Sequence, residues 1–233
     1  MAKAPADVDK AIEADIIHTL KQLGFPQSAD EWLTADPVID PNQQTLRMLG
    51  HPVMSGWEEP YMRKLAEIVT AKASGGRVLE LGYGLGISAG FIQQNPPAEH
   101  VIIEMNRHVA DQARRFAGRC GSKVTILEGL WQDVVPGLPS DSFQGILFDT
   151  YPMSEHEVDV IFYPFLEHAY RLLAPGGVLT YYSDEATWFS PEHLDGLRAV
   201  GFTKVDGVLC PITPPDGCEY WRQPTILAPI VEK

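Results

Sequence analysis

A glycine-rich stretch at residues 77–88 has the residue types and spacing to bind a cofactor: RVLELGYGLGIS. The apolar run before the glycines is typical of a buried parallel strand, and the residues after them are compatible with a helix. Gly82, Gly84 and Gly86 allow positive φ angles and let a ligand approach the main chain without meeting a Cβ. The helix N-terminus offers unpaired N–H groups to a polar ligand. Any tight strand-to-helix turn shares this pattern, so neighbouring residues must decide between the two interpretations.

Two acidic residues near this turn favour cofactor binding. Glu104 ends a second apolar segment, HVIIE, about 20 residues beyond the glycines, where a carboxylate can accept both ribose hydroxyls of an adenosine cofactor. Glu80 precedes the first glycine, and an acidic residue, one spacer and then G-x-G-x-G resembles the pattern of class I S-adenosylmethionine-dependent methyltransferases. In that class the turn holds the methionine end of the cofactor.

The elements that must position these residues alternate along the chain. Apolar runs predict strands at 77–81, 100–104, 123–127, 145–149 and 178–182. Helical periodicity is expected over 60–72, 87–94, 107–118, 157–173 and 191–199. With residues 202–208 and a proline-rich hairpin through 211–232, the sequence predicts an α/β fold with a seven-stranded, mostly parallel, doubly wound (Rossmann-like) sheet. The candidate polar residues lie at strand carboxyl ends, where such sheets bind ligands: Glu80, Glu104, Gln132 and Asp149.

The region before the first strand is expected to be helical. Residues 8–24 carry apolar side chains at helical spacing, and residues 42–50 also favour a helix. We therefore expect an N-terminal helical segment or lid over residues 1–43 and a methyltransferase domain over residues 44–233. The first helix can pack on the core or pair with another subunit, so a homodimer is one expectation.

Composition and charge narrow the functional classes. The 233 residues carry a formal net charge of −13, which argues against a nucleic-acid partner and favours cationic ligands. Three cysteines without C-x-x-C spacing indicate reduced thiols and neither a disulfide framework nor a zinc site. No apolar run approaches the ~18 residues of a membrane span, so we expect a cytoplasmic protein without a membrane partner.

Seven stretches in this order resemble the guanidinoacetate N-methyltransferase family, which includes related arginine N-methyltransferases. The resemblance covers roughly residues 44–233 and rests on LRMLGHPVMSGWEEPYM, RVLELGYGLGIS, HVIIEMN, EGLWQDV, FDTYP, RLLAPGGVLTYY and TPPDGCEYW. It implies the seven-stranded methyltransferase fold and S-adenosyl-L-methionine as cofactor.

The resemblance also implies cofactor-binding residues. The methionine end would be wrapped by Tyr83, Gly84, Leu85, Gly86, Ile87 and Ser88, and the ribose would be held by Glu104. The adenosine would be bordered by Met105, Asn106, Leu130, Trp131 and Gln132, although the family has an acidic residue where this chain has Gln132. The cofactor would be covered or packed upon by Trp32, Met54 and Met62.

Glu58 and Asp149 match the two carboxylates that hold the substrate guanidinium in the family. Paired carboxylates meet a planar guanidinium with bidentate, charge-assisted hydrogen bonds. They can also draw off a proton and localise electron density on the attacking nitrogen, a chemistry that needs no metal. Met54 and Tyr151 would border the substrate, although Tyr151 fits a packed core equally well.

Residues 180–188, TYYSDEATW, bear on which guanidine is bound. Guanidinoacetate enzymes have an uncharged stretch there, whereas Asp184 and Glu185 would repel a substrate carboxylate and attract an α-ammonium group. The segment from Trp188 to Phe202 is also shorter than in the family, which leaves room for a longer substrate. We therefore expect free L-arginine or a close relative as substrate. The alternatives are guanidinoacetate, arginine in a protein, or a cofactor-binding protein without activity.

Overall fold

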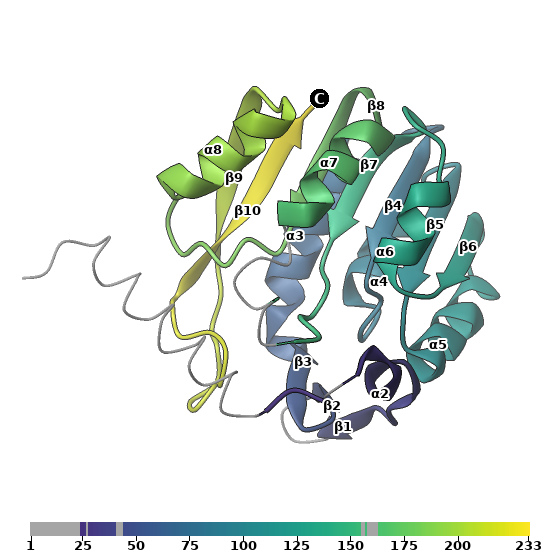
Figure 1. Cartoon of the computed structure of the whole chain (residues 1–233), viewed down its shortest axis with the longest axis vertical. Coiled ribbons are helices and arrows are strands. Elements are labelled where there is room, and N and C mark those ends of the chain that lie inside the picture. The colour runs from purple at the N-terminus through teal and green to yellow at the C-terminus, as the bar shows by residue number, and fades with distance from the viewer. Residues whose placement is uncertain (1–23, 27, 41–43, 155–156, 158–162) are drawn as a thin grey trace, which may run out of the picture.

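The main body of the protein is a seven-stranded sheet with the order β6-β5-β4-β7-β8-β10-β9 (Figure 1). The computed structural model describes residues 24–26, 28–40, 44–154, 157 and 163–233. The first five strands in this order are parallel, and β10 is antiparallel to both of its neighbours. The strands are β4 (Arg77–Leu81), β5 (Glu99–Glu104), β6 (Lys123–Glu128), β7 (Phe143–Phe148), β8 (Leu173–Tyr181), β9 (Lys204–Pro211) and β10 (Thr225–Glu232). The predicted seven-stranded, mostly parallel sheet is confirmed.

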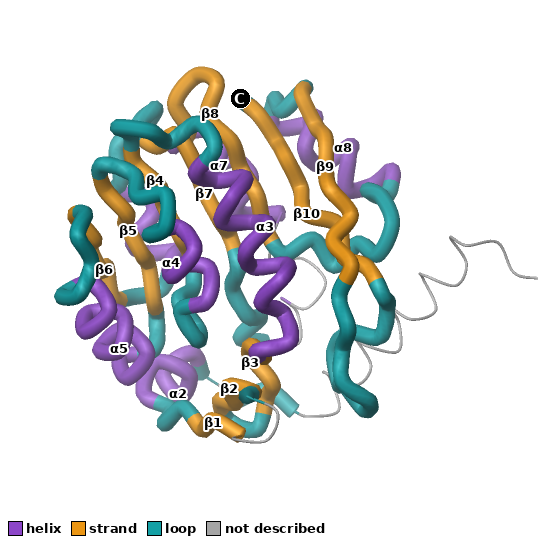
Figure 2. Tube along the Cα trace, turned by 180° about the vertical axis from the view of Figure 1, so that it is seen from behind, coloured by secondary structure: helices purple, strands orange, loops and turns teal. Residues whose placement is uncertain are grey.

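Helices cover both faces of this sheet, so its central strands are apolar on both sides. One face packs against α3 (Glu59–Thr70) and α4 (Ile87–Ile92), which lie in front of the sheet in Figure 2. The other face packs against α7 (Tyr163–Leu172) and α8 (Pro191–Val200), while α5 (Arg107–Ala117) and α6 (Trp131–Val134) flank β5 and β6. Along β4, Val78 joins the core beneath α3 and Leu79 joins the core beneath α7.

A second, three-stranded antiparallel sheet forms where the sequence predicted a helix over residues 42–50. It contains β1 (Val38–Asp40), β2 (Thr45–Met48) and β3 (His51–Ser55). Leu49 and Gly50 join β2 to β3 as a two-residue hairpin turn, with φ angles of 51° and 86°. Positive φ at both positions suits the right-handed twist of a hairpin and cannot continue a helix. The helix prediction was therefore wrong for the described part of this range.

The N-terminal region is described from residue 24, so the helix predicted over residues 8–24 lies almost wholly outside the described residues. A short helix, α2 (Ala29–Thr34), places Trp32 in the protein interior. β1 lies before the domain boundary expected between residues 43 and 44, and it pairs with β2 beyond that boundary. The first part of the helix predicted over 157–173 also falls outside the description, and α7 occupies the rest.

The strand order reverses direction between β4 and β7. The chain runs outward from β4 through β5 to β6, then returns to β7 on the other side of β4. A crevice outside the strand carboxyl ends is the expected ligand site at such a reversal. Figure 1 shows α2 and the small sheet lying across these ends. Within the described chain, no helix has both the length and the apolar character required to traverse a lipid bilayer.

Candidate functional site

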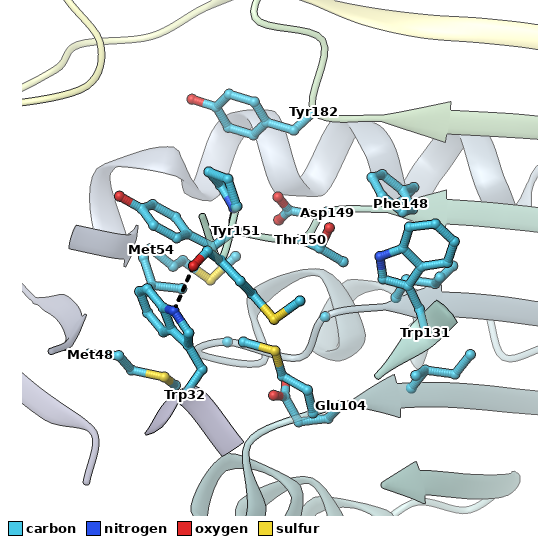
Figure 3. A pocket seen from close by; sticks show the side chains of 18 of the residues that line it. Trp32, Met48, Met54, Glu104, Trp131, Phe148, Asp149, Thr150, Tyr151 and Tyr182 are labelled. Atoms are coloured by element: carbon cyan, nitrogen blue, oxygen red, sulfur yellow. Dashed lines mark hydrogen bonds between the residues drawn. The ribbon is translucent and has the colours of Figure 1, made fainter. Parts of the chain in front are cut away.

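A deep cavity opens at the carboxyl ends of the central strands, beneath α2 and the small sheet (Figure 3). It contains about 1520 Å³ of space free of protein atoms, including the open solvent at its mouth. Its lining combines Met and aromatic side chains with a few acidic ones. In Figure 3, Asp149 lies between Tyr182 and Glu104, which project from opposite sides of the view.

The glycine-rich turn forms one wall of the cavity and requires its glycines. Gly82 has a φ of 89°, and a Cβ on it would lie 2.0 Å from the carbonyl oxygen of Asp149. The end of β4 and the residue after β7 can approach this closely only because Gly82 has no side chain. Gly84 has a φ of 52°, and its Cβ would lie 2.8 Å from the sulfur of Met54. Met54 also accepts a hydrogen bond from the Leu85 N–H at 3.2 Å, so it covers the turn.

Glu104 lines the cavity at the end of β5, and its carboxylate is buried. Its two oxygens accept hydrogen bonds from the backbone N–H groups of Tyr83 and Asn106, both at 2.9 Å. Burial raises its pKa, while these N–H donors oppose the rise. The backbone N–H groups of Gly84 and Met105 also lie against this carboxylate and lower its pKa. Its position in the cavity wall lets a ligand hydroxyl approach it.

Aromatic side chains pack together at one end of the cavity, where Trp32 and Tyr151 line it. Trp32 is fully buried, and its indole N–H donates to the carbonyl oxygen of Met153 at 3.0 Å (Figure 3). Its ring lies beside those of His51 and Tyr151, with centroids 5.2 Å and 5.8 Å away. Tyr151 and His51 are joined by a hydrogen bond of 3.1 Å between Oη and Nδ1. The loop after β7 is thereby tied to α2 and β3.

Glu58 and Asp149 both line the cavity, although they are far apart in sequence. Asp149 follows β7 and turns part of its surface toward the cavity, while Glu58 is 3% exposed at the start of α3. Burial, then the charges of Glu80 and Asp184, raises the pKa of Asp149 to about 7. Burial is also the main cause that raises the pKa of Glu58 to about 8, with a contribution from Asp149. Two carboxylates in the lining of one cavity favour a cationic ligand in that cavity.

Local structure orients the Glu58 carboxylate. Ser55 and Glu58 form a capping box at the 3₁₀ turn Gly56–Glu58, in which Oε1 of Glu58 accepts the Ser55 N–H at 2.7 Å. Tyr220 donates its hydroxyl to the same oxygen at 2.5 Å. The capping box explains why the side chain turns back toward β3 and does not point into solvent.

Most residues predicted to bind cofactor or substrate do line the cavity. From the predicted cofactor set these are Trp32, Met54, Gly84, Glu104, Met105, Leu130, Trp131 and Gln132, and from the substrate set they are Met54, Glu58, Asp149, Tyr151 and Asp184. Among the described residues, those predicted to bind the cofactor but absent from the lining are Met62, Tyr83, Leu85, Gly86, Ile87, Ser88 and Asn106.

Several of the predicted residues that do not line the cavity have structural roles instead. Ser88 is buried and its hydroxyl donates to Glu80. Asn106 caps α5 by accepting from the N–H groups of His108 and Val109, and its amide donates to the carbonyl oxygen of Trp32. Met62 is fully buried in the core beneath the site.

Glu185 differs from its prediction as a substrate residue. Its carboxylate accepts the Ser190 N–H at 2.8 Å and contacts Nδ1 of His193 at 3.3 Å, so it stabilises the start of α8. Asp184 lines the cavity with a φ of 54°, and it is exposed, so it lies at the open side of the cavity. The expected acidic pair is therefore a single carboxylate at the mouth.

Sequence reasoning did not assign Tyr182 and Tyr220, which both line the cavity. Tyr220 belongs to the stretch TPPDGCEYW, but nothing in its spacing indicates that it reaches Glu58. Within the described chain, buried polar atoms without a hydrogen-bond partner include Gln132 Oε1, Thr150 Oγ1 and Tyr182 Oη. Such atoms are uncommon in proteins, and their position in a cavity wall suits contacts with a ligand.

Comparison with protein families shows a match over residues 24–233 to the family described as guanidinoacetate N-methyltransferase. A curated relative from Yarrowia lipolytica, named protein arginine N-methyltransferase 2, is 33% identical over 150 residues, which is 62% of this chain and 31% of the relative. A relative of the same name from Aspergillus oryzae is 42% identical over 108 residues, or 46% of this chain and 25% of the relative. The chain therefore matches only a third or less of these relatives' length.

Solved structures share the fold at low sequence identity. A spermidine synthase in complex with the transition-state analogue AdoDATO has a TM-score of 0.61 and 15% identity, covering 85% of this chain and 69% of that one. A Burkholderia thailandensis 1,6-didemethyltoxoflavin-N1-methyltransferase, with S-adenosylhomocysteine bound, has a TM-score of 0.53 and 18% identity, covering 100% of this chain and 92% of that one. These similarities establish the architecture only.

Proposed function

Because this chain belongs to the guanidinoacetate N-methyltransferase family, we propose that it methylates the guanidino group of a small molecule with S-adenosyl-L-methionine as donor. We propose free L-arginine, or a close relative, as the preferred substrate. The observation that carries the proposal is the pairing of Glu58 and Asp149 in one buried cavity, next to a glycine-rich turn and an acidic strand end.

The cavity wall near the turn fits S-adenosyl-L-methionine. Glu104 lies in the cavity wall, where its carboxylate can accept ribose hydroxyls, and Gln132 presents an unpartnered acceptor that suits the adenine amino group. Gly84 lines the cavity, and Met54 packs against it at the position where a side chain would lie. When bound, this cofactor supplies an electrophilic methyl group on a positively charged sulfur, and the acidic lining suits that charge.

Glu58 and Asp149 would hold the guanidinium and prepare its nitrogen for methylation. Each carboxylate can accept charge-assisted hydrogen bonds from the N–H groups of the planar cation. A free guanidinium has a pKa above ~12, so its nitrogen is a poor nucleophile until a proton leaves. Asp149, whose pKa is raised to about 7, is suited to accept that proton.

Asp184 supports the preference for L-arginine. Because Asp184 lies at the mouth of the cavity and the other two carboxylates lie deeper, a longer substrate would place its α-ammonium group near Asp184. Guanidinoacetate has no ammonium group, and its carboxylate would be repelled there. Asp184 is exposed and therefore screened by solvent, so its contribution to this preference is modest.

The names of the curated relatives favour a second candidate, arginine within a protein. A screen for S-adenosylhomocysteine release with L-arginine, guanidinoacetate, agmatine and arginine-containing peptides separates the candidates. We expect the highest kcat/KM with L-arginine. Higher kcat/KM with guanidinoacetate or with peptides would replace L-arginine as the substrate, and no release with any guanidine would refute the proposed activity. A rise in Tm on adding S-adenosyl-L-methionine tests the cofactor separately.

A further inference from the structure

The segment between β9 and β10, residues 212–224, brings a side chain from the far end of the chain to the site. In Figures 1 and 2 this segment extends past the end of its two strands, on the side where the small sheet lies. Tyr220 in this segment lines the cavity, and its ring lies beside that of Trp57, with centroids 5.7 Å apart. Its hydroxyl donates to Oε1 of Glu58 at 2.5 Å.

The hydrogen bonds of Glu58 distinguish its two oxygens. The Ser55 N–H and the Tyr220 hydroxyl both donate to Oε1. Among the described residues, both donors to the Glu58 side chain therefore bind the same oxygen. Oε2 is left for a ligand in the cavity, and the plane of the carboxylate is fixed by two donors from different segments.

An ion pair holds the segment that carries Tyr220. The guanidinium of Arg47, on β2, contacts both carboxylate oxygens of Glu219, the residue before Tyr220, at 2.5 Å and 3.4 Å. Arg47 also donates to the carbonyl oxygen of Gly50 at 2.9 Å, within the β2–β3 turn. Arg47 and Glu219 are 27% and 33% exposed, so the pair is partly shielded from solvent. A bidentate arginine–carboxylate pair fixes geometry as well as distance.

We infer that Tyr220 is a positioning residue, which orients the Glu58 carboxylate so that Oε2 faces the substrate guanidinium, and that the Arg47–Glu219 pair holds Tyr220 in place. This inference rests on the proposed function in one respect, the role of Glu58 in binding a guanidinium. The hydrogen-bonding role of Tyr220 toward Glu58 stands on geometry alone.

Removal of the Tyr220 hydroxyl would change the ionisation of Glu58. The charges of Asp149 and Asp184 face Glu58 and disfavour its anionic form, and Tyr182 and Cys218 also lie near it. The Tyr220 hydroxyl opposes the effect of burial because it donates to the carboxylate. A Glu58 that has lost this donor holds its proton more tightly, and a neutral carboxyl group binds a guanidinium weakly.

The test compares Tyr220→Phe with wild type by ¹³C NMR titration of glutamate carboxyl carbons, with the Glu58 signal assigned through Glu58→Gln. We expect the Glu58 pKa to rise by about one to two units, the range that a hydrogen bond to a charged group supports. Tyr170→Phe, whose ring packs on Phe202 away from the cavity, makes the same chemical change and should leave the Glu58 titration unaltered.

The ion pair is tested by Arg47→Gln, with the exposed ion-pair variant Arg114→Gln as its control. Arg47→Gln should shift the Glu58 titration in the same direction as Tyr220→Phe, by a smaller amount, and Arg114→Gln should not shift it. An unchanged Glu58 titration in Arg47→Gln would overturn the role of the ion pair. The same result in Tyr220→Phe would overturn the positioning role.

Activity separates this inference from the proposed function. With a guanidine that wild type methylates, Tyr220→Phe should lower kcat/KM roughly 10- to 100-fold and move its acidic limb to higher pH. The affinity for S-adenosyl-L-methionine should stay as in wild type, because Tyr220 contacts Glu58 and not the glycine-rich turn. A shifted Glu58 titration in a protein that methylates no guanidine would refute the proposed function and leave the role of Tyr220 toward Glu58 intact. An unchanged kcat/KM in an active enzyme would refute a role for Tyr220 in the reaction.

Discussion

Replacement of Asp149 by asparagine should make the protein less active and, above neutral pH, more stable. The variant keeps the size of the side chain but removes one of the two carboxylates proposed to hold the guanidinium. Loss of a positioned proton acceptor typically costs on the order of 10² to 10⁴ in rate, so we expect kcat to fall at least ~100-fold. The Kd for S-adenosyl-L-methionine, measured by calorimetry, should remain close to the wild-type value.

The stability gain follows from the pKa of Asp149. Burial raises this pKa from 3.8 to about 7, so the native state binds the proton more tightly than the unfolded state does. The group therefore lowers the free energy of unfolding as pH rises from about 4 to about 7. At 1.36 kcal/mol for each pKa unit, the loss reaches up to about 4 kcal/mol at pH 8. Asparagine carries no charge at any pH and avoids this loss.

Urea unfolding at pH 4.5 and pH 8, without ligands, measures the effect. The variant should exceed wild type in free energy of unfolding at pH 8, and this difference should largely vanish at pH 4.5. Asp195→Asn, at an exposed position on α8, serves as the control and should show no such pH dependence. A stability difference that is equal at both pH values would refute the electrostatic reasoning. Wild-type kcat with every guanidine tested would remove Asp149 from the reaction.

Three further predictions address other parts of the cavity. Glu58→Gln should lower kcat at least ~100-fold with little change in cofactor affinity. The kcat/KM of wild type should rise between pH 6 and 8, because the pKa of Glu58 is raised to about 8 and the carboxyl group must lose its proton to bind the guanidinium. A flat pH profile of kcat/KM would contradict this role of Glu58. Glu104→Ala should raise the Kd for S-adenosyl-L-methionine roughly tenfold through loss of charged hydrogen bonds, and an unchanged Kd by calorimetry would remove Glu104 from the site. Asp184→Asn should reduce the preference for L-arginine over guanidinoacetate roughly two- to fivefold, and an unweakened preference would refute the role of Asp184. Glu185→Gln should leave this preference unchanged and lower the Tm, because Glu185 stabilises the start of α8.

Much of the site follows from the sequence because parallel strands place their carboxyl ends along one edge. The apolar runs that end at Glu104 and Asp149 are short and continuous, as expected of buried parallel strands, and the glycines after residue 81 favour a turn that opens a helix. Alternation of strands and helices then predicts a doubly wound sheet, in which these ends must lie close together. Glu104 and Asp149 could therefore be assigned to one cavity from local patterns alone.

The tertiary structure decided the features that depend on contacts between distant segments. Leu46, Arg47 and Met48 are good helix formers, yet pairing with β1 and β3 and a left-handed turn at Leu49 place them in a strand. Glu185 is adjacent to Asp184 in sequence, but its carboxylate contacts the N-terminus of α8 and His193.

Tyr220 reaches Glu58 across 162 positions, and Trp32 donates to Met153 across 121. Periodicity specifies which face of a strand or helix is buried, because that face repeats every two or 3.6 residues. It carries no information about which residue of a distant loop will meet a given carboxylate, and only the packing of the complete chain determines that contact.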